Sequence, residues 1–409
     1  MRILWLCNVA IPAVSALMGE RAPVVGGWLS REAELLMAEH SLFVLFRHDS
    51  RCISGGAGNL AYQSFCGKDD ETVMEQALRQ FRPDIIHIWG TEIKHSDDFV
   101  KIVERLGLMD RCVISLQGLV GPCAYHYAAG VPEAIQRRYT LRDFLKRDRI
   151  CDAQNRFARR GEYERDALER AKNVIGRTEW DKAVATQINP DLRYFHCDET
   201  LRGPFYERAW SLELAQRHSI FVSQCGYSLK GFHRVLEAMP LILRQYPDAT
   251  ISVTGKDLLH LSPAQKLKLP GYEKYLIEEI DALGLREHIQ FLGTLDAEAM
   301  AEQYLHSHVF VSASSIENSS NSVGEAMLLG CPVVSSWVGG VTSMMEHGKE
   351  GFFYQADAPY LMAHFVCCIF GDDALARRLS ENARVRAKQT HDPDRNHRRM
   401  LEIYAELRK

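Results

Sequence analysis

Short apolar runs rich in β-branched residues alternate with amphipathic segments along the chain. The segments between the runs, such as WLSREAELLMAE and TVMEQALRQF, space their apolar residues as one face of a helix does. This alternation predicts an α/β fold built on parallel sheets. The runs with strand character cover residues 3–7, 42–46, 84–89, 112–116 and 173–176 in the first half, and 219–223, 249–255, 288–293, 308–312 and 332–336 in the second.

The pattern stops near Leu201–Leu214 and then starts again, which predicts two domains. A chain of 409 residues also exceeds the size at which one hydrophobic core usually stops growing. We expect Rossmann-like, doubly wound domains over residues 1–200 and 215–390. A last amphipathic helix, within 393–409, is expected to pack back on the first domain. Parallel sheets bind ligands beyond the carboxyl ends of their strands, and two such sheets facing each other favour a nucleotide-type ligand.

The composition excludes several classes of protein. A net charge of -4 argues against a general nucleic-acid binder. The 11 cysteines contain no C-x-x-C pair, which argues against a zinc ribbon or a disulfide scaffold and favours a reducing cytoplasm. The N-terminal MRILWLCNVAIP fits a first strand better than a signal peptide. The apolar stretch LMAHFVCCIF has about half the length that a membrane span needs.

The stretch SSIENSSNSVGEAMLLGCPVVSSWVGGV, residues 314–341, is the most informative. It predicts a polar loop after a strand, then a helix that starts near Asn321 and ends at Gly330. A helix N-terminus attracts anions such as a diphosphate, the Ser322 hydroxyl can donate to one, and Glu325 could hold vicinal hydroxyls. The alternative is that Asn321 or Ser322 caps the helix and Glu325 complements its dipole. This stretch alone leaves the two interpretations about even.

Taken with its surroundings, the stretch resembles the donor site of glycosyltransferase family 4, whose members have the two-domain GT-B fold. The resemblance lies in two glutamates eight positions apart, followed by A-M-x-x-G-x-P-V-V and G-G. It implies that Glu325 holds the nucleotide ribose and that Glu317 contacts the transferred sugar. Lys230 and Gly231 in YSLKGFHRVL resemble the family's K-G motif, whose lysine contacts the donor diphosphate. A lysine beside a helix N-terminus is a sound phosphate site, although a single lysine is more commonly a solvated surface residue.

Two weaker resemblances add to the donor site. HIQFLGTLD is similar to the segment before the donor glutamates, which places Gly293 and Thr294 near the nucleobase. Gly26 and Gly27 follow the first strand, as in the family's glycine-rich loop, where glycine lets the backbone approach a phosphate or a sugar. As a motif, two glycines alone are weak.

The chain departs from the family pattern at two positions. The family usually has an arginine five positions before the K-G lysine, and Cys225 stands there; Arg177 or a backbone N–H near Gly226 are candidate substitutes. Many members carry a histidine where this chain has Gln117, followed by Gly118. Glutamine can hydrogen-bond a sugar hydroxyl but cannot exchange a proton. His126 lies close in sequence and is the alternative, although a histidine between tyrosines is as often structural.

The resemblance implies a retaining glycosyltransferase that moves a sugar from a UDP- or GDP-sugar to a glycan or lipid-linked acceptor, in cell-surface polysaccharide or glycolipid biosynthesis. We expect no cofactor and no metal, because no D-x-D pair stands in a donor loop and Lys230 with helix N–H groups could neutralise the leaving diphosphate. Two alternatives stay open: a GT-B nucleotide-sugar epimerase, and a non-catalytic subunit that binds nucleotide sugars.

Two segments remain outside these motifs. Residues 137–172 contain 12 Lys/Arg and 7 Asp/Glu. They could form a basic surface that touches anionic lipid from the cytoplasmic side, or a phosphate-bearing acceptor, but a solvated, salt-bridged helix pair is the favoured interpretation. SGGAG, residues 54–58, resembles a dinucleotide loop superficially but lacks the strand and helix that one needs, and we predict a mobile loop.

Overall fold

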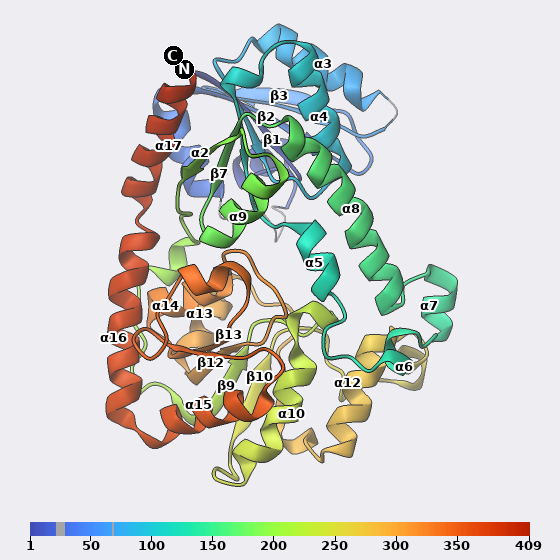
Figure 1. Ribbon diagram of the computed structural model, residues 1–409, viewed down its shortest axis with the longest axis vertical. Helices are drawn as coiled ribbons and strands as arrows, with labels where there is room; N and C mark the ends of the chain where they lie inside the picture. The colour runs from blue at the N-terminus through green and yellow to red at the C-terminus, as the bar shows by residue number, and fades with distance from the viewer. Residues whose placement is uncertain (22–28, 68) are drawn as a thin grey trace. The chain divides into compact units, whose positions relative to one another are not determined.

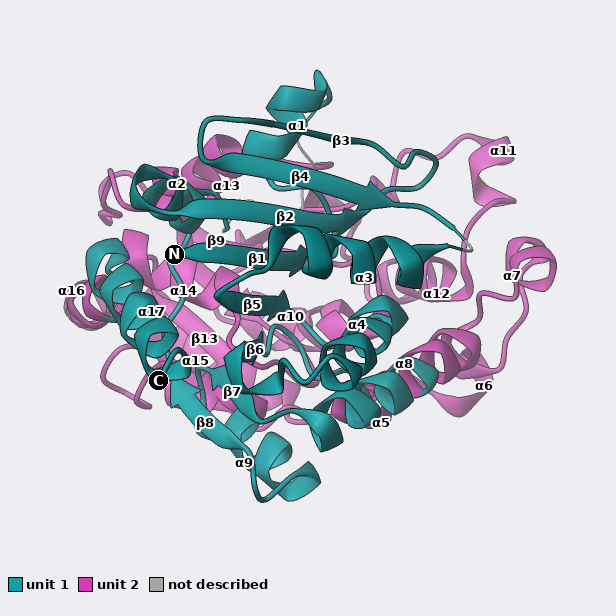
Figure 2. Cartoon of the chain, turned by 90° about the horizontal axis from the view of Figure 1, so that it is seen from above, with its two compact units in different colours: residues 1–121, 159–202, 390–409 teal, residues 122–158, 203–389 magenta. Residues whose placement is uncertain are grey.

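The computed structural model describes residues 1–21, 29–67 and 69–409 (Figure 1). The chain forms two compact units, coloured separately in Figure 2. Unit 1 contains Met1–Gly121, Arg159–Arg202 and Thr390–Lys409, and unit 2 contains Pro122–Ala158 and Gly203–Gln389. The division differs from the domain boundaries expected from the sequence at residues 122–158, which belong to unit 2.

Unit 1 is built on an eight-stranded sheet with the order β3-β4-β2-β1-β5-β6-β7-β8. The neighbouring strands are parallel except for the pair at the β3 edge. The five apolar runs of the first half are β1, β2, β5, β6 and β7, as expected. The strands are β1 (Arg2–Cys7), β2 (Ser41–Arg47), β3 (Ser54–Ala57), β4 (Leu60–Phe65), β5 (Ile85–Trp89), β6 (Cys112–Ser115), β7 (Asn173–Gly176) and β8 (Arg193–His196).

The prediction of a mobile loop at SGGAG was wrong. Ser54–Ala57 forms β3, an exposed edge strand that pairs antiparallel with β4 through a tight turn at Gly58 and Asn59. Gly58 has a φ of +58°, which suits a tight hairpin turn. Glycine-rich strands lack the β-branched residues that reveal a strand, so this strand has no recognisable pattern in the sequence.

Helices surround this sheet, and the last one is tied to its interior. They are α1 (Pro12–Met18), α2 (Leu29–Glu39), α3 (Asp70–Phe81), α4 (Lys94–Arg105), α9 (Glu179–Ile188), α17 (Pro393–Leu407), and the unit 1 parts of α5 (Val120–His126) and α8 (Ile150–Arg170). Helix α17 begins at an N-cap formed by Asp392, and its buried Met400, Ile403 and Leu407 join the core on one face of the sheet.

A buried chain of hydrogen bonds anchors α17. Trp5 Nε1 donates to Tyr404 Oη over 3.2 Å, and Tyr404 Oη lies 2.6 Å from His87 Nδ1. The other ring nitrogen, Nε2, lies 2.7 Å from Ser115 Oγ. Burial lowers the pKa of His87 to about 3, so the ring is neutral. A single arrangement then satisfies every group: the indole donates to Tyr404, the hydroxyl of Tyr404 donates to His87, and Nε2–H donates to Ser115.

Replacing Tyr404 by Phe should destabilise unit 1 by about 1–3 kcal/mol, because it leaves Trp5 Nε1 and His87 Nδ1 buried without their partner. The melting temperature of Y404F measures this loss. The control is Tyr360→Phe, which removes a hydroxyl from a side chain that is 62% exposed and should change little. Equal melting temperatures for the two variants would contradict the role given to the network.

Unit 2 contains a six-stranded parallel sheet with the order β11-β10-β9-β12-β13-β14. All five runs expected in the second half are strands, whereas β14 was not expected. In unit 1, β3, β4 and β8 were not expected. The strands are β9 (Gln216–Val222), β10 (Thr250–Val253), β11 (Ile289–Phe291), β12 (Ser307–Ser312), β13 (Val333–Ser336) and β14 (Phe352–Tyr354).

The helices of unit 2 follow the strands in turn. They are α10 (Phe232–Leu243), α11 (Pro263–Lys266), α12 (Gly271–Ala282), α13 (Ala297–Leu305), α14 (Asn321–Leu329), α15 (Pro359–Gly371) and α16 (Asp373–Thr390), with α6 (Glu133–Gln136) and α7 (Leu141–Lys146) from the inserted segment. The apolar stretch noted in the sequence lies in α15. Within the described ranges, no helix is both long and apolar enough to cross a bilayer.

Candidate functional site

The candidate donor site lies at the carboxyl edge of the sheet of unit 2. From β9 the chain moves outward on one side to β10 and β11, then crosses to β12 on the other side of β9. The loops after β9 and β12 therefore leave two adjacent strands in opposite directions, which is the point where open parallel sheets bind ligands. The K-G motif and Glu317 occupy these two loops.

The two loops are joined backbone to backbone. Ser315 N donates to Leu229 O over 2.8 Å. Gly231, with a φ of +68°, lies against the backbone of Ala313 so closely that a Cβ at this position would overlap the Ala313 carbonyl oxygen. Glycine is thus needed for both its conformation and its size. The close approach brings the residue before it, Lys230, beside the loop that carries Glu317.

A matched pair of glycines can test this close approach. Gly284 has the same φ of +68° as Gly231, but a Cβ there would meet nothing within 4 Å. Gly284→Ala should therefore cost only the strain of a left-handed alanine, about 1–2 kcal/mol. Gly231→Ala should lower the melting temperature clearly further, because the two loops must separate. If the two variants had the same melting temperature, the contact between Gly231 and Ala313 would not hold the loops together.

Lys230 and Glu317 form an ion pair at the centre of the site. Lys230 Nζ lies 2.5 Å from Glu317 Oε1, and the same oxygen accepts a hydrogen bond from Ser314 Oγ over 2.7 Å. The side chains are 22% and 17% exposed, so the pair is partly open to a ligand. Burial acts to lower the pKa of Lys230, but the neighbouring Glu317 and Tyr227 outweigh it and hold that pKa above its ordinary value. The ammonium is therefore charged at neutral pH.

The Gly-Gly pair of the sequence motif supports Glu317 from the other side. Gly340 N donates to Glu317 O over 3.0 Å. A Cβ on Gly339, whose φ is +48°, would overlap the same carbonyl oxygen. The pair follows β13, so three successive loops at this edge fix the position of one carboxylate.

The N-terminus of α14 opens at the same edge. The helix begins at Asn321, as predicted, and Gly330 ends it in the left-handed conformation with a φ of +87°. Ser320 occupies the N-cap position without a side-chain capping bond, and the first turn contains no acidic residue. The hydroxyl of Ser322 lies 3.0 Å from that of Ser320. The capping alternative is therefore not what the structure shows, and the end of the helix keeps its positive potential.

The other predicted residues of unit 2 lie around this edge with different exposure. Glu325 is on α14 with only 3% of its surface exposed, so it belongs to the packed wall of the site. Gly293 has a φ of +70° with open space at the Cβ position, and Thr294 after it is exposed. Gly293 O accepts a hydrogen bond from Gly255 N over 2.9 Å, which joins the loops after β10 and β11.

Cys225, which stands where the family has an arginine, is buried. Its Sγ donates to Thr254 O over 3.4 Å, and burial raises the pKa of the thiol to about 12. The side chain is a neutral packing group and supplies no charge for a phosphate.

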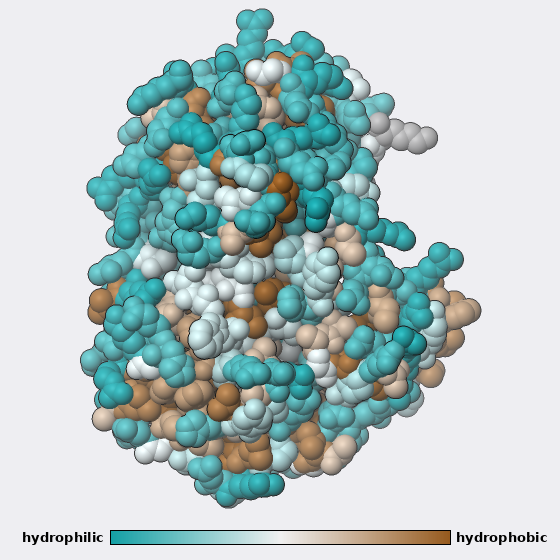
Figure 3. Space-filling model, viewed as in Figure 1, coloured by the Kyte–Doolittle hydropathy of each residue, from teal (hydrophilic) through white to brown (hydrophobic). Residues whose placement is uncertain are grey.

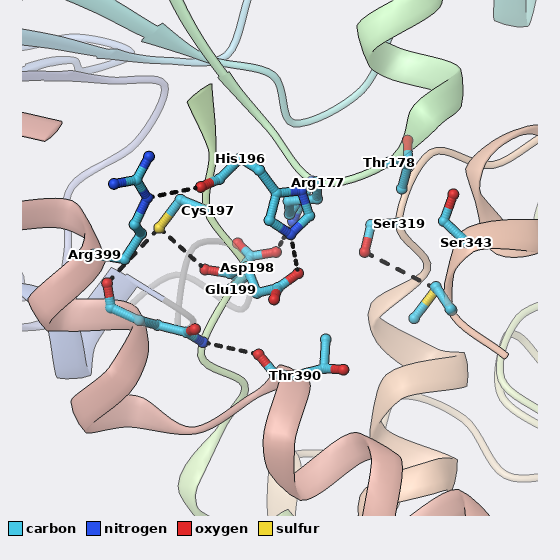
Figure 4. Close-up of polar contacts among 12 residues, drawn as sticks. Arg177, Thr178, His196, Cys197, Asp198, Glu199, Ser319, Ser343, Thr390 and Arg399 are labelled. Carbon is cyan, nitrogen blue, oxygen red and sulfur yellow. Dashed lines mark hydrogen bonds and ion pairs between the residues drawn. The ribbon is translucent and has the colours of Figure 1, made fainter. Parts of the chain in front are cut away.

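Gln117, Gly118 and Arg177 lie in unit 1, at the carboxyl ends of β6 and β7. Arg177 is paired with Glu199 (Figure 4). Its Nη2 also donates to Leu116 O and Gln117 O over 3.2 and 3.1 Å. The guanidinium thus already has partners in unit 1, where it holds the backbone at Gln117. Gln117, Arg177 and Glu199 line a cavity of about 40 Å³, enough for a few waters.

The remaining predicted residues are placed as follows. His126 is exposed at the end of α5, in the part of that helix assigned to unit 2. Gly26 and Gly27 lie outside the described residues.

Two further glutamates, which the sequence patterns do not predict as site residues, lie at the carboxyl edge of the unit 1 sheet. Glu92 follows β5, and its Oε1 accepts a hydrogen bond from Gly118 N over 2.8 Å; burial raises its pKa. Glu164 on α8 accepts hydrogen bonds from the backbone N–H groups of Val120 and Gly121, each over 3.0 Å. The segment WGTE directly after the strand could have revealed Glu92. The position of Glu164 in the middle of a long charged helix gave no signal.

Glu164 should give the protein a distinct pH dependence. Burial raises its pKa to about 7, above the ordinary value of 4.5, against the opposing effect of its N–H donors. A group with a raised pKa favours folding when protonated, and that stability is lost as the pH rises through about 7. The melting temperature of Glu164→Gln relative to the wild type should therefore increase from pH 5 to pH 8. Glu298→Gln, at an exposed glutamate, is the control, and a difference independent of pH at position 164 would refute the assignment.

Comparison with known proteins finds a family match over the segment that contains the candidate donor site. Residues 206–386 match the family described as "Glycosyl transferases group 1". We refer to residues 206–386 as the group 1 domain, after this match. The domain contains all of the sheet of unit 2, together with Lys230, Glu317 and α14.

One curated relative of the group 1 domain is a D-inositol 3-phosphate glycosyltransferase of Corynebacterium urealyticum. The identity is 26% over 201 residues, which is 49% of this chain and 45% of the relative. The chain spans about half the length of the curated relatives it matches.

Solved structures extend the likeness to the whole fold. Sucrose-phosphate synthase from Thermosynechococcus elongatus matches with a TM-score of 0.69 and 16% identity over 100% of this chain and 99% of that chain. Anabaena HepE in complex with UDP-glucose matches with a TM-score of 0.67 and 17% identity over 98% and 99%. The chain thus has the GT-B fold, with the group 1 domain as its second half.

Proposed function

We propose that the protein is a retaining glycosyltransferase that transfers a sugar from a nucleotide-diphosphate sugar to an acceptor hydroxyl. The observation that carries this proposal is the arrangement within the group 1 domain. An uncapped helix N-terminus, a charged lysine and a fixed carboxylate meet at the switch point of one parallel sheet. A helix end and a cation bind a diphosphate, and a carboxylate held nearby binds sugar hydroxyls.

In the proposed complex the diphosphate lies at the first turn of α14, where Asn321 and Ser322 supply donors, with Lys230 beside it. Glu317 then accepts hydrogen bonds from hydroxyls of the sugar. Glu325 holds the ribose after a side-chain movement exposes its buried carboxylate. Charge accumulates on the diphosphate as it leaves, and Lys230 with the helix dipole stabilises that charge. We infer that the reaction needs no metal, because these groups already neutralise the leaving group.

For the second half of the reaction we propose that the leaving diphosphate helps to deprotonate the acceptor hydroxyl on the same face of the sugar. Gln117 and Gly118 would orient the acceptor by hydrogen bonds, with no proton exchanged by the glutamine. We expect the acceptor to be a glycan or a lipid-linked sugar of the cell surface, used at the cytoplasmic face of a membrane. A UDP-sugar is the favoured donor, since the related fold of HepE was crystallised with UDP-glucose.

Lys230→Met should weaken UDP-glucose binding by about 10- to 100-fold, because it removes one charged partner of the diphosphate. Calorimetry and ligand-dependent melting temperature measure the change. Lys349→Met is the matched control: this lysine is also in the group 1 domain and also ion-paired, with Glu346, but lies three residues before β14, at the amino edge of the sheet. Equal affinities of the two variants would contradict the proposed diphosphate position.

Glu317→Gln should separate binding from turnover. Donor affinity should stay within a few-fold, while transfer or slow hydrolysis of UDP-glucose should fall by about 10²-fold or more, as when one transition-state partner is removed. Product analysis also tests the alternatives. An epimerised sugar without transfer would indicate an epimerase. Nucleotide binding without any turnover would indicate a non-catalytic subunit, which the buried Cys225 in place of an arginine would then explain.

A further inference from the structure

Helix α7 has its amphipathic pattern reversed. Three large apolar side chains on this short helix, Leu141, Phe144 and Leu145, are 64%, 69% and 72% exposed. Their spacing of three and four residues places them on one face. Tyr139, just before the helix, is 54% exposed, whereas the carboxylate of Asp143 on the opposite face is fully buried. A helix normally buries its apolar face, so this one needs a separate explanation.

Hydrogen bonds fix α7 in this orientation. Asp143 Oδ2 accepts a bond of 2.7 Å from Gly271 N, at the first residue of α12. Thr140 caps the helix by accepting from Asp143 N over 3.1 Å. A Cβ on Gly271 would lie only 3.1 Å from the Asp143 carboxylate, so the contact is tight. The polar side of α7 is therefore held against the start of α12, and its apolar side cannot turn inward.

The charges around the exposed face are positive. Arg138 and Arg142 are neutralised by Glu278 and Asp148, at 2.5 and 2.6 Å. Lys146 and Arg147, at the end of α7, are exposed and take part in no ion pair within the described ranges. On α8, Arg156 and Arg170 are ion-paired, with Asp148 and Glu104. Lys146 and Arg147 supply positive charge without an ion-pair partner among the described residues, beside the apolar face of α7.

Helix α7 is placed where it can meet the flat surface of a bilayer. In Figure 2 the helix lies at the periphery of unit 2, and in Figure 3 apolar side chains gather at the edge of the surface where Figure 1 places α7. A convex tip with apolar side chains and adjacent lysine and arginine matches the interface of an anionic bilayer, where apolar groups enter the acyl boundary and cations meet lipid phosphates.

We propose that Tyr139, Leu141, Phe144 and Leu145, with Lys146 and Arg147, form a docking tip that binds the surface of an anionic lipid membrane. The inference rests on the proposed function only in giving the transferase a place beside a lipid-linked acceptor. Charge complementarity is the reason to prefer a bilayer over a protein groove. The tip would enter the headgroup region without spanning the bilayer.

The test is sedimentation of the full chain with vesicles of phosphatidylcholine alone or mixed with phosphatidylglycerol. The wild type should bind the mixed vesicles and lose binding at high salt. The triple variant Leu141→Ser/Phe144→Ser/Leu145→Ser should bind at least about tenfold more weakly, as should Lys146→Glu/Arg147→Glu. The matched control is Leu267→Ser/Tyr360→Ser/Val385→Ser, which removes three apolar side chains that are 67%, 62% and 62% exposed elsewhere in unit 2.

Unchanged vesicle binding in the α7 triple variant, or absence of binding by the wild type, would overturn the proposal. Self-association of the wild type that the α7 variant abolishes, without vesicle binding, would assign the face to a second copy instead. Melting temperature and UDP-glucose affinity of each variant show whether it folds. Because vesicle binding is measured without donor or acceptor, its outcome is independent of whether the protein proves to be a transferase.

Discussion

The close approach of Gly231 to the Ala313 carbonyl is the constraint on which the candidate donor site depends. Two loops that leave neighbouring strands in opposite directions would otherwise separate. Because the backbones touch, Lys230 can reach Glu317, and the resulting ion pair is held from a third loop by Gly340. A lysine and a carboxylate this close neutralise each other when the site is empty. A diphosphate changes that balance, since it offers the lysine a second anion.

In unit 1, buried polar groups hold segments that are distant in the sequence in fixed positions. Its C-terminal helix α17 comes from the far end of the chain and is tied to the sheet through Tyr404 and His87. At the carboxyl edge, Arg177 bonds the backbone of Leu116 and Gln117 while Glu199 balances its charge. Burying these groups costs solvation, and the network offsets that cost only when every member has its partner. Such networks fix the positions of their side chains more than they raise the free energy of unfolding.

The sequence predicted the ten main strands because apolar β-branched runs are a strong local signal. It also located the helix beginning at Asn321 and the loops that carry Lys230 and Glu317, since turn residues and motif spacing are local too. It could not find β3, which is made of glycine and small residues. The carboxylate of Glu164 and the reversed exposure of α7 depend on partners far away in the sequence. Only the folded chain shows that Asp143 is bound by Gly271, and so which face of α7 is left open.

The most direct measurement for the donor site is a crystal structure of the full chain with UDP. The diphosphate should lie within hydrogen-bond distance of the first-turn N–H groups of α14 and of Lys230 Nζ. The ribose should lie toward Glu325, and the base toward Gly293. A nucleotide bound elsewhere in the chain, or a diphosphate that contacts neither α14 nor Lys230, would contradict it.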